Sequence, residues 1–228
     1  MKHSFLYTFV VALAVLYGCS NSTSTPPTLV IPSAGTNWTL LNIHRDNTGK
    51  VIKTDTSIRK IDQTNIVYVG YSDVVSIVET NLSTKIQDTV YIRYLSNGDI
   101  SRLSSPALGV QPPVWLTVPY STHTAQAFNF GGSASASGFT HDSVSFTASF
   151  VNGENDTVGT DIYAASVVTS STWQHATSAT KDSTDSITQT NSFIPSKGIF
   201  GNRNVSINQI NGKDVQREQQ ILIGVSVK

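Results

Sequence analysis

The chain has 228 residues, enough for one domain of ordinary size. Its 15 basic and 15 acidic side chains give a formal net charge of zero, which argues against a nucleic-acid partner, because such proteins need a basic face. Hydrophobic residues make up 39% of the chain, which is enough for a core and argues against wholesale disorder. Thirty serines and 27 threonines, against three glutamates, favour β-structure over helix.

The N-terminal residues have the features of an export signal. Lys2 and His3 form a short positive start, and Phe5–Leu16 is an uncharged apolar run of 12 residues. This length is typical of a signal peptide and too short to cross a bilayer, which takes about 20 residues. We therefore expect residues 1–18 to be removed as a signal peptide.

The end of this segment, Leu16-Tyr17-Gly18-Cys19, resembles the lipobox of bacterial lipoproteins. The resemblance implies cleavage between Gly18 and Cys19, a diacylglyceryl group on the Cys19 thiol and acylation of the new amine. Cys19 is the only cysteine in the chain, so an intrachain disulfide is excluded. Two or more acyl chains anchor a protein stably, so membrane lipid is the expected partner of acylated Cys19. An ordinary secretory signal with an incidental cysteine is the alternative.

The residue after the cysteine bears on localisation. Ser20 stands where enteric lipoproteins retained in the inner membrane carry aspartate, so the resemblance implies sorting to the outer membrane. No acidic run follows Cys19, which favours the periplasmic face over the cell surface.

Residues 19–36 are expected to form the lipidated cysteine and a flexible tether. Ser, Thr and Asn dominate this segment, and Pro26, Pro27 and Pro32 lack the N–H donors that a sheet interior requires. Leu29–Ile31 is a small apolar patch, which predicts either docking on the domain or a plain flexible spacer.

Residues 37–228 read as one antiparallel β domain. Apolar and polar residues alternate with period two over Ser143–Val151 and again over Ile221–Lys228. No long linker divides this region. We expect an all-β fold of about ten to twelve strands, either a curved antiparallel sheet (a half-barrel) or a β-sandwich.

Turn residues separate the predicted strands. Asn97-Gly98 is the strongest hairpin signal, and Asn47-Thr48-Gly49 and Asn211-Gly212 predict two more hairpins. A fourth turn is expected at Asn152–Asn155, with the return strand starting at Thr157.

Four segments have weaker signals. Short helices are predicted at Asn81–Asp88 or Thr122–Ala127. Ser104–Pro113, which is rich in proline, and Gly131–Gly138, which is rich in small residues, are expected to be loose.

Features after residue 110 suggest a second resemblance. Val114–Pro119, Gly153–Tyr163 and Phe193–Phe200 follow one another in an order that resembles uncharacterised bacterial lipoproteins, which look related to lipoprotein carriers of the LolA and LolB type. In those carriers a curved sheet wraps an apolar cavity that can hold acyl chains. The resemblance implies a cavity lined by the inward faces of the strands: Val144, Phe146, Phe150, Ile221 and Ile223.

No residue pattern indicates catalysis, a metal or a cofactor. His44, His123, His141 and His175 have none of the tight spacings of metal ligands, and no G-x-S-x-G nucleophile motif is present. The three tryptophans, Trp38, Trp115 and Trp173, are predicted to pack in the core or at strand edges, with a carbohydrate platform as the alternative.

These observations predict a non-enzymatic, membrane-anchored lipoprotein of the cell envelope with a binding or structural role. An envelope protein or an apolar ligand is the expected partner besides membrane lipid. One alternative is a carrier or chaperone that holds lipids or other apolar ligands in a half-barrel cavity. The other is an envelope hydrolase, which would need a histidine and a carboxylate converging in a cleft.

Overall fold

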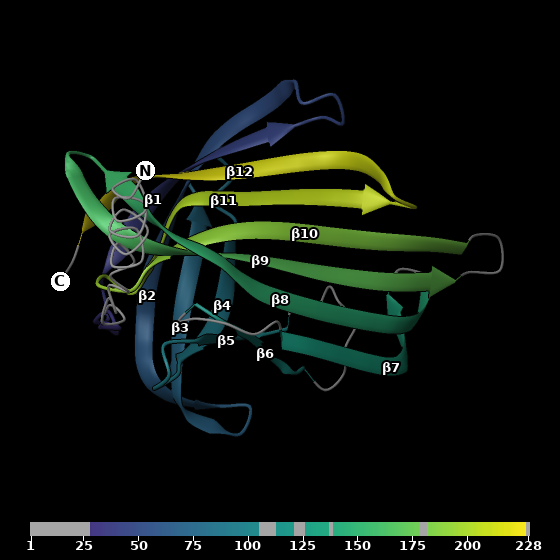
Figure 1. Cartoon of the computed structure of the whole chain (residues 1–228), viewed down its shortest axis with the longest axis horizontal. Coiled ribbons are helices and arrows are strands. Elements are labelled where there is room, and N and C mark those ends of the chain that lie inside the picture. Colours follow the sequence, from purple (N-terminus) through teal and green to yellow (C-terminus); the bar gives the residue numbers. More distant parts are fainter. Residues whose placement is uncertain (1–27, 105–112, 121–125, 137–138, 178–181, 227–228) are drawn as a thin grey trace, which may run out of the picture.

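The structure is a computed structural model that describes residues 28–104, 113–120, 126–136, 139–177 and 182–226. Within these ranges every regular element is a β-strand, and the strands form one antiparallel sheet (Figure 1). The all-β prediction is therefore confirmed. No helix in the described ranges is long and apolar enough to cross a membrane.

The described sheet has twelve strands, within the predicted ten to twelve. The N-terminal six are β1 (Asn37–Arg45), β2 (Val51–Tyr68), β3 (Tyr71–Asn81), β4 (Gln87–Tyr94), β5 (Ile100–Leu103) and β6 (Trp115–Val118). The C-terminal six are β7 (Gln126–Ala136), β8 (Phe139–Val158), β9 (Asp161–Thr177), β10 (Asp182–Ile194), β11 (Ile199–Ile210) and β12 (Lys213–Ser226).

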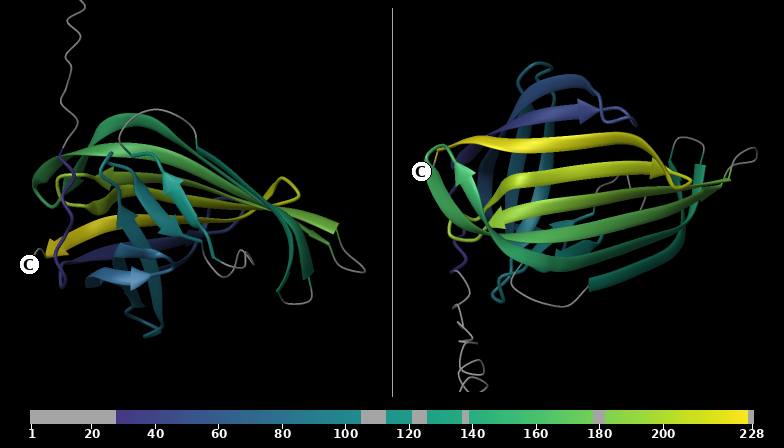
Figure 2. Two further views of the ribbon diagram at one scale, coloured as in Figure 1. Left: turned by 90° about the horizontal axis from the view of Figure 1, so that it is seen from below. Right: turned by 45° about the horizontal axis from the view of Figure 1, so that its top comes forward.

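The first and last strands are neighbours in the middle of the sheet. The strand order is β6-β5-β4-β3-β2-β1-β12-β11-β10-β9-β8-β7, so each half of the chain forms its own meander. Pairing of β1 with β12 joins the two meanders; Leu40 faces Leu222 and His44 faces Glu218 in this register. The sheet curves strongly, so that the two halves face each other across an interior (Figure 2).

Side-chain packing closes the interior on one side. Leu116 on edge strand β6 forms a buried cluster with Phe146 and Ala148 on β8. Because β8 lies near the opposite edge of the same sheet, this contact turns the sheet into a half-barrel. The described strands do not form the two separate sheets of a β-sandwich.

Three of the predicted turns are confirmed. Gly49, Gly98 and Gly212 have φ angles of 86°, 88° and 74°, a conformation that glycine adopts without steric cost. In the first turn the Asp46 carboxylate accepts hydrogen bonds from the backbone N–H of Thr48 at 2.9 Å. These turns fix the β1–β2, β4–β5 and β11–β12 hairpins.

The turn predicted at Asn152–Asn155 is wrong. β8 continues through it to Val158, and the chain reverses at Gly159 and Thr160 instead. The register shifts between Phe150 and Asn152, and the strand then pairs with β9 as far as Val158. The extra residue is Val151, and Asn152–Asn155 then pair with β9 in regular register, because the neighbouring strand supplies partners along the whole run.

The weaker predictions had mixed outcomes. Asn81–Asp88 is not a helix: it contains the end of β3, a turn and the start of β4. Most of Thr122–Ala127 and of Ser104–Pro113 lies outside the described residues. Gly131–Ala136 is part of β7, so the expectation of a loose segment is wrong there. Pairing with β8 holds these residues in a strand although small residues are typical of loops.

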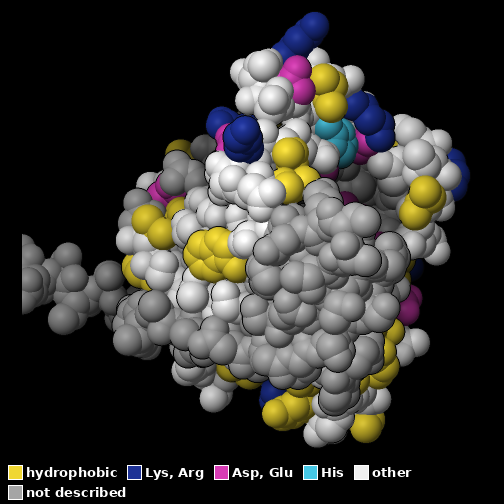
Figure 3. All heavy atoms as spheres, turned by 90° about the vertical axis from the view of Figure 1, so that its right-hand side faces the viewer, with side chains coloured by type: hydrophobic (Ala, Val, Ile, Leu, Met, Phe, Trp, Pro, Cys, Tyr) yellow, Lys and Arg dark blue, Asp and Glu magenta, His cyan; other side chains and the backbone are white. Residues whose placement is uncertain are grey.

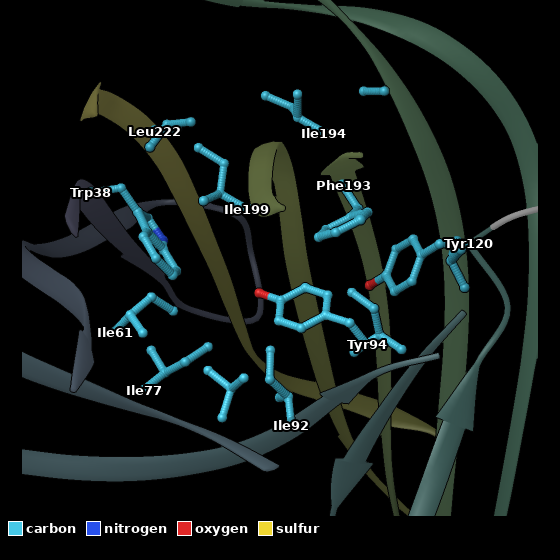
Figure 4. Close-up of a cluster of buried hydrophobic side chains, with 14 of the residues drawn as sticks. Trp38, Ile61, Ile77, Ile92, Tyr94, Tyr120, Phe193, Ile194, Ile199 and Leu222 are labelled. Carbon is cyan, nitrogen blue, oxygen red and sulfur yellow. The ribbon is translucent and has the colours of Figure 1, made fainter. Parts of the chain in front are cut away.

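The main core lies at one end of the half-barrel (Figure 4). Trp38, Leu40, Ile61 and Leu222 come from the central strands and are at most 3% exposed. Aromatic rings of Tyr94, Tyr120, Phe193 and Phe200 pack beside them, with centroid separations between 4.9 and 6.5 Å.

Residues 28–36, here called the strap, lie against this core. Leu29 packs on the core cluster, and the backbone N–H of Val30 donates to the carbonyl of Pro195 at 2.9 Å. Of the two alternatives for Leu29–Ile31, docking is seen at Leu29, so a plain flexible spacer is wrong there; the side chains of Val30 and Ile31 are 42% and 56% exposed.

Candidate functional site

The inner face of the central strands changes from apolar to polar along its length. On β1 the inward positions are Trp38, Leu40, Asn42 and then His44. Alternation places every second residue on one face, so the apolar end forms the core and the polar end lines the rest of the interior. Buried polar side chains inside a half-barrel need hydrogen-bond partners, so the polar end of the interior is the candidate site.

Asn42 is the centre of a buried hydrogen-bond network. Its amide nitrogen donates to Asp55 Oδ1 at 2.8 Å and to Ser57 Oγ at 3.2 Å. Its amide oxygen accepts a hydrogen bond of 3.1 Å from Gln220 Nε2. The three central strands β12, β1 and β2 are therefore joined by side chains as well as by backbone.

The network continues to an ion pair on β2 and β3. Ser57 Oγ donates to Glu79 Oε1 at 2.8 Å, and Arg59 Nε contacts Glu79 Oε2 at 2.7 Å. Arg59 Nη2 also donates to Gln220 Oε1 at 3.0 Å. The charge of Arg59 is thus compensated by Glu79, and both groups are hydrogen-bonded.

A hollow of about 110 Å³ lies inside the half-barrel beside this ion pair. Its wall combines side chains from both halves of the sheet. The lining comprises Arg59, Ile77, Glu79, Val90, Ile92, Ile100, Arg102, Val118, Tyr120, Ser170, Gln189, Asn191, Phe200 and Gln220.

Arg102 is the unusual residue of this hollow. Within the described ranges, its guanidinium has no carboxylate partner, and it faces Tyr120 and Arg59. Burial lowers the pKa of Arg102; the nearby Tyr120 opposes this shift, and the charge of Arg59 adds to it. A cation in such a place costs free energy unless an anion joins it.

Tyr120 supplies a second donor to the same hollow. Its side chain is 3% exposed, and burial raises its pKa, so the hydroxyl keeps its proton across the neutral range. Two guanidiniums, this hydroxyl and three side-chain amides, together with the Glu79 carboxylate that pairs with Arg59, therefore surround a space of roughly three or four water volumes. Such a donor set fits the oxygens of one carboxylate or phosphate group.

A second charged cluster lies at the polar end of the interior. Lys53 Nζ contacts Asp55 Oδ2 at 2.6 Å, and this contact, followed by the Asn42 hydrogen bond, lowers the pKa of Asp55 to about 2. His44 lies between Asp55 and Glu218, with each ring nitrogen 3.3 Å from a carboxylate oxygen. Figure 3 shows acidic and basic side chains gathered near a histidine on this end of the molecule.

This cluster has the residue types of a catalytic site but a different arrangement. A histidine base must leave one ring nitrogen free for the group whose proton it takes. Both nitrogens of His44 face carboxylates, so neither is directed at a hydroxyl. Within the described residues, no group of three or more acidic, histidine or cysteine side chains has the geometry of a metal site.

The five residues predicted to line a cavity are spread over several places. Phe146 is buried against Leu116, and Phe150 is half-buried beside the main core. Ile221 is half-buried, and Ile223 is 52% exposed. Val144 lies on β8, facing Phe130 across the β7 pair, and its side chain is outside the described set.

A bulge explains the position of Ile223. β1 pairs Leu40 with Leu222 but Thr39 with Gly224, so one extra residue sits on β12 between these pairs. An extra residue reverses the side-chain alternation beyond it. Leu222 and Val225 therefore pack on the core, whereas the sequence pattern had placed Ile221, Ile223 and Val225 on one face.

Ile223 does line another hollow, of about 420 Å³, which is more open. It lies between the β8–β9 turn, the β10–β11 turn and the end of β12. Aliphatic side chains of Val158, Ile194, Ile199, Ile223 and Val225 contribute to its wall, together with Lys197 and Tyr163. The Lys197 ammonium is 5.1 Å from the centre of the Tyr163 ring.

Other predicted residues do not join either hollow. Trp38 is 1% exposed in the core, which excludes a surface platform made of all three tryptophans. Trp115 and Trp173 lie on β6 and β9. Gly18 and Cys19 lie outside the described residues, as do His123 and the side chains of His141 and His175.

Sequence reasoning missed Arg102, Tyr120 and the Arg59–Glu79 pair. A signal for Arg102 was present: Ile100 and Arg102 alternate on one strand, and Ile100 is 1% exposed. An arginine on the buried side of a strand is a candidate binding residue. The position of Tyr120, after Pro119 and beyond the end of β6, gave no such signal.

Comparison with known proteins identifies the fold alone. No protein-family model and no curated protein matches the chain. A solved candidate lipoprotein from Parabacteroides distasonis ATCC 8503 superposes with a TM-score of 0.52 and 14% identity, covering 87% of this chain and 99% of that one. A candidate exported protein with a YmcC-like fold from Bacteroides fragilis NCTC 9343 has a TM-score of 0.43 and 12% identity, with the same coverage.

Proposed function

We propose that this protein is a lipid-anchored protein of the bacterial cell envelope with a non-enzymatic binding role. The apolar leader and Leu16–Cys19 support export and acylation of Cys19. The candidate lipoprotein from Parabacteroides distasonis, which shares the fold, is in keeping with this reading. Ser20 favours the outer membrane, and the missing acidic run after Cys19 favours its periplasmic face.

Binding takes place in the hollow that Arg102 faces. The single observation that carries this proposal is the Arg102 guanidinium, which lacks a carboxylate partner among the described residues. An incoming anion would supply the missing charge, and Tyr120, Gln189 and Asn191 stand around it. The ligand is therefore a molecule that presents one carboxylate or phosphate group.

The first experiment measures whether small anions bind. The purified mature protein is heated in increasing concentrations of acetate and, separately, inorganic phosphate, against chloride at equal ionic strength. A ligand that binds only the folded state raises the melting temperature by mass action. We expect wild type to respond and Arg102→Gln not to respond.

A matched control tests whether the effect belongs to the hollow. Arg93 is also on the N-terminal half of the sheet, but it lies on the outer face and pairs with Asp73 at 2.7 Å. Arg93→Gln should respond to the anions as wild type does. Equal responses from Arg102→Gln and wild type, or no response from any of the three proteins, would contradict binding in this hollow.

The anchor is tested separately. Cys19→Ser should move the protein from the membrane pellet to the soluble fraction, or leave the leader uncleaved, because the acyl acceptor is gone. Mass spectrometry of wild type should show the mass of at least two acyl chains on the N-terminal residue. Membrane recovery of a cleaved Cys19→Ser protein at wild-type levels would exclude acylation as the anchor.

A carrier of apolar ligands is the second candidate, for which the 420 Å³ hollow supplies the volume and Ile223 an exposed aliphatic side chain. Its volume lies in the range of small-molecule sites, whereas the interior hollow is several times too small for an acyl chain. Native mass spectrometry of the purified protein separates the two: a co-purified lipid lost on denaturation supports the carrier. If the protein carries no co-purified lipid and its melting temperature still rises with acetate or phosphate, the anion-binding role is supported.

A further inference from the structure

The hairpin between β2 and β3 ends in an exposed apolar tip. The tip is defined here as Val67–Tyr71, and its turn is the lowest point of the molecule in Figure 1. Val67 is 80% exposed, and Tyr68, Val69 and Tyr71 are between 37% and 42% exposed. No charged residue occurs between Gln63 and Ser72. Apolar side chains that are exposed together, rather than singly, are typical of a contact surface.

The tip is held in a fixed shape by contacts with β4 and β6. The β2–β3 register shifts three times between Ile61 and Tyr68, which bends the hairpin. Val69 has a φ angle of 42°, a conformation that β-branched residues avoid, and Gly70 follows at 84°. Trp115 Nε1 donates to the Val69 carbonyl at 3.2 Å, which fixes the turn to edge strand β6. A strained valine at an exposed turn indicates a role beyond folding.

The two tyrosines of the tip contact aromatic rings of β4 and β6. Tyr68 stacks on Tyr91 with centroids 4.0 Å apart, and Tyr71 meets Trp115 edge-on at 5.7 Å. Arg93 lies 3.5 Å above the Tyr71 ring. These rings are stacked on one another or perpendicular, so they do not present the flat shared surface that a sugar ring would need. The Arg93 guanidinium is also paired with Asp73 at 2.7 Å, so its charge is compensated.

We propose that this tip inserts into the headgroup region of a lipid bilayer. Tyrosine and tryptophan side chains favour that interface, and aliphatic side chains favour the region beneath it. The inference rests on the proposed anchor at Cys19. Residues 19–27 span at most about 30 Å, so an acylated Cys19 keeps the half-barrel close to the membrane. Insertion of the tip would give the tethered protein one fixed orientation.

The test uses a probe at the tip of the acylated protein. Val67→Cys is labelled with an environment-sensitive fluorophore; because acylation consumes the thiol of Cys19, the chain's only cysteine, the new thiol is uniquely reactive. The protein is reconstituted in vesicles of phosphatidylethanolamine and phosphatidylglycerol that contain a lipid with a nitroxide quencher near its headgroup. Ile162→Cys, 68% exposed at the β8–β9 turn, is the matched control.

Severalfold stronger quenching at position 67 than at position 162 supports insertion. Equal quenching at the two positions overturns the proposal. So does a probe at position 67 that is shielded from solvent in whole envelopes but not in vesicles, because that result would indicate a protein partner. Flotation of the Cys19→Ser chain, expressed without residues 1–18, with the same vesicles removes the dependence on the anchor. There Val67→Asp should lower vesicle binding about tenfold and Ile162→Asp should leave it unchanged. Unaltered binding by Val67→Asp overturns the proposal even if Cys19 is acylated.

Discussion

The Tyr94 hydroxyl donates a hydrogen bond of 2.8 Å to the carbonyl of Gly198, joining β4 to the turn between β10 and β11. The two residues are 104 positions apart and belong to opposite halves of the sheet. The same turn receives the strap, since Pro195 accepts the hydrogen bond of the Val30 N–H. One turn therefore ties together the N-terminal meander, the C-terminal meander and the strap.

Tyr94→Phe should lower the free energy of unfolding by about 1 to 2 kcal/mol, because it leaves a buried carbonyl without its donor. Urea denaturation of the purified protein measures the difference. Tyr163→Phe is the control, because its hydroxyl contacts Asp161 at an exposed site. A loss in Tyr163→Phe as large as that in Tyr94→Phe would show that the Gly198 contact is not special.

Gly198→Ala should destabilise the protein and free the strap. A Cβ at this position would lie 2.1 Å from the Val30 carbonyl oxygen, and the φ angle is 66°. Gly159→Ala is closely matched, with a φ of 64° and no atom within 4 Å, so it should cost only about 1 kcal/mol for its backbone strain. Limited proteolysis within residues 28–36 should become faster in Gly198→Ala alone. Equal stability and equal cleavage in the two variants would contradict the steric explanation.

Arg102 and Arg59 should respond to the same substitution with opposite signs. Arg102→Met removes a partly buried cation without a described carboxylate partner, so the ligand-free protein should gain about 1 kcal/mol. Arg59→Met leaves Glu79 without its cation and should lose about 2 kcal/mol. Denaturant unfolding in chloride buffer checks both values. Destabilisation by Arg102→Met would show that an unobserved partner already compensates this charge.

The pH dependence of stability should contain a contribution from Asp55. Its pKa is lowered to about 2, so the folded state holds the ionised form more strongly than the unfolded state does. The stabilisation is present above the unfolded pKa near 4 and is lost as pH falls toward 2; because the partner Lys53 is 54% exposed, we expect about 1 kcal/mol. Asp55→Asn should flatten the stability profile between pH 4 and 2. An unchanged acid profile would mean that Lys53 does not act on Asp55 in solution.

Local chemistry predicted much of the strand layout. Asn97-Gly98 and Asn211-Gly212 marked true hairpins because their backbone conformations depend on the turn residues themselves. The Asn- and Gly-rich run at Asn152–Asn155 carried a similar signal but became part of β8, because β9 offers partners along its whole length. A turn signal therefore predicts a reversal only where no neighbouring strand continues the pairing.

The face of a strand was less predictable than its existence. One bulge at Ile223 places Leu222 and Val225 on the core and leaves Ile223 exposed. An inserted residue reverses the two-residue alternation of inward and outward side chains. The sequence pattern does not show where such a residue is inserted, so it does not predict which side chains beyond it face the core.

By itself, the sequence determined the all-β class and three of the hairpins, because each depends on residues close together in the chain. Only the tertiary structure decided that β1 and β12 meet, and that Arg59, Arg102 and Tyr120 share one hollow with Gln189 and Gln220. These side chains come from strands far apart in sequence. Their meeting depends on the curvature of the whole sheet, which no local run of residues encodes.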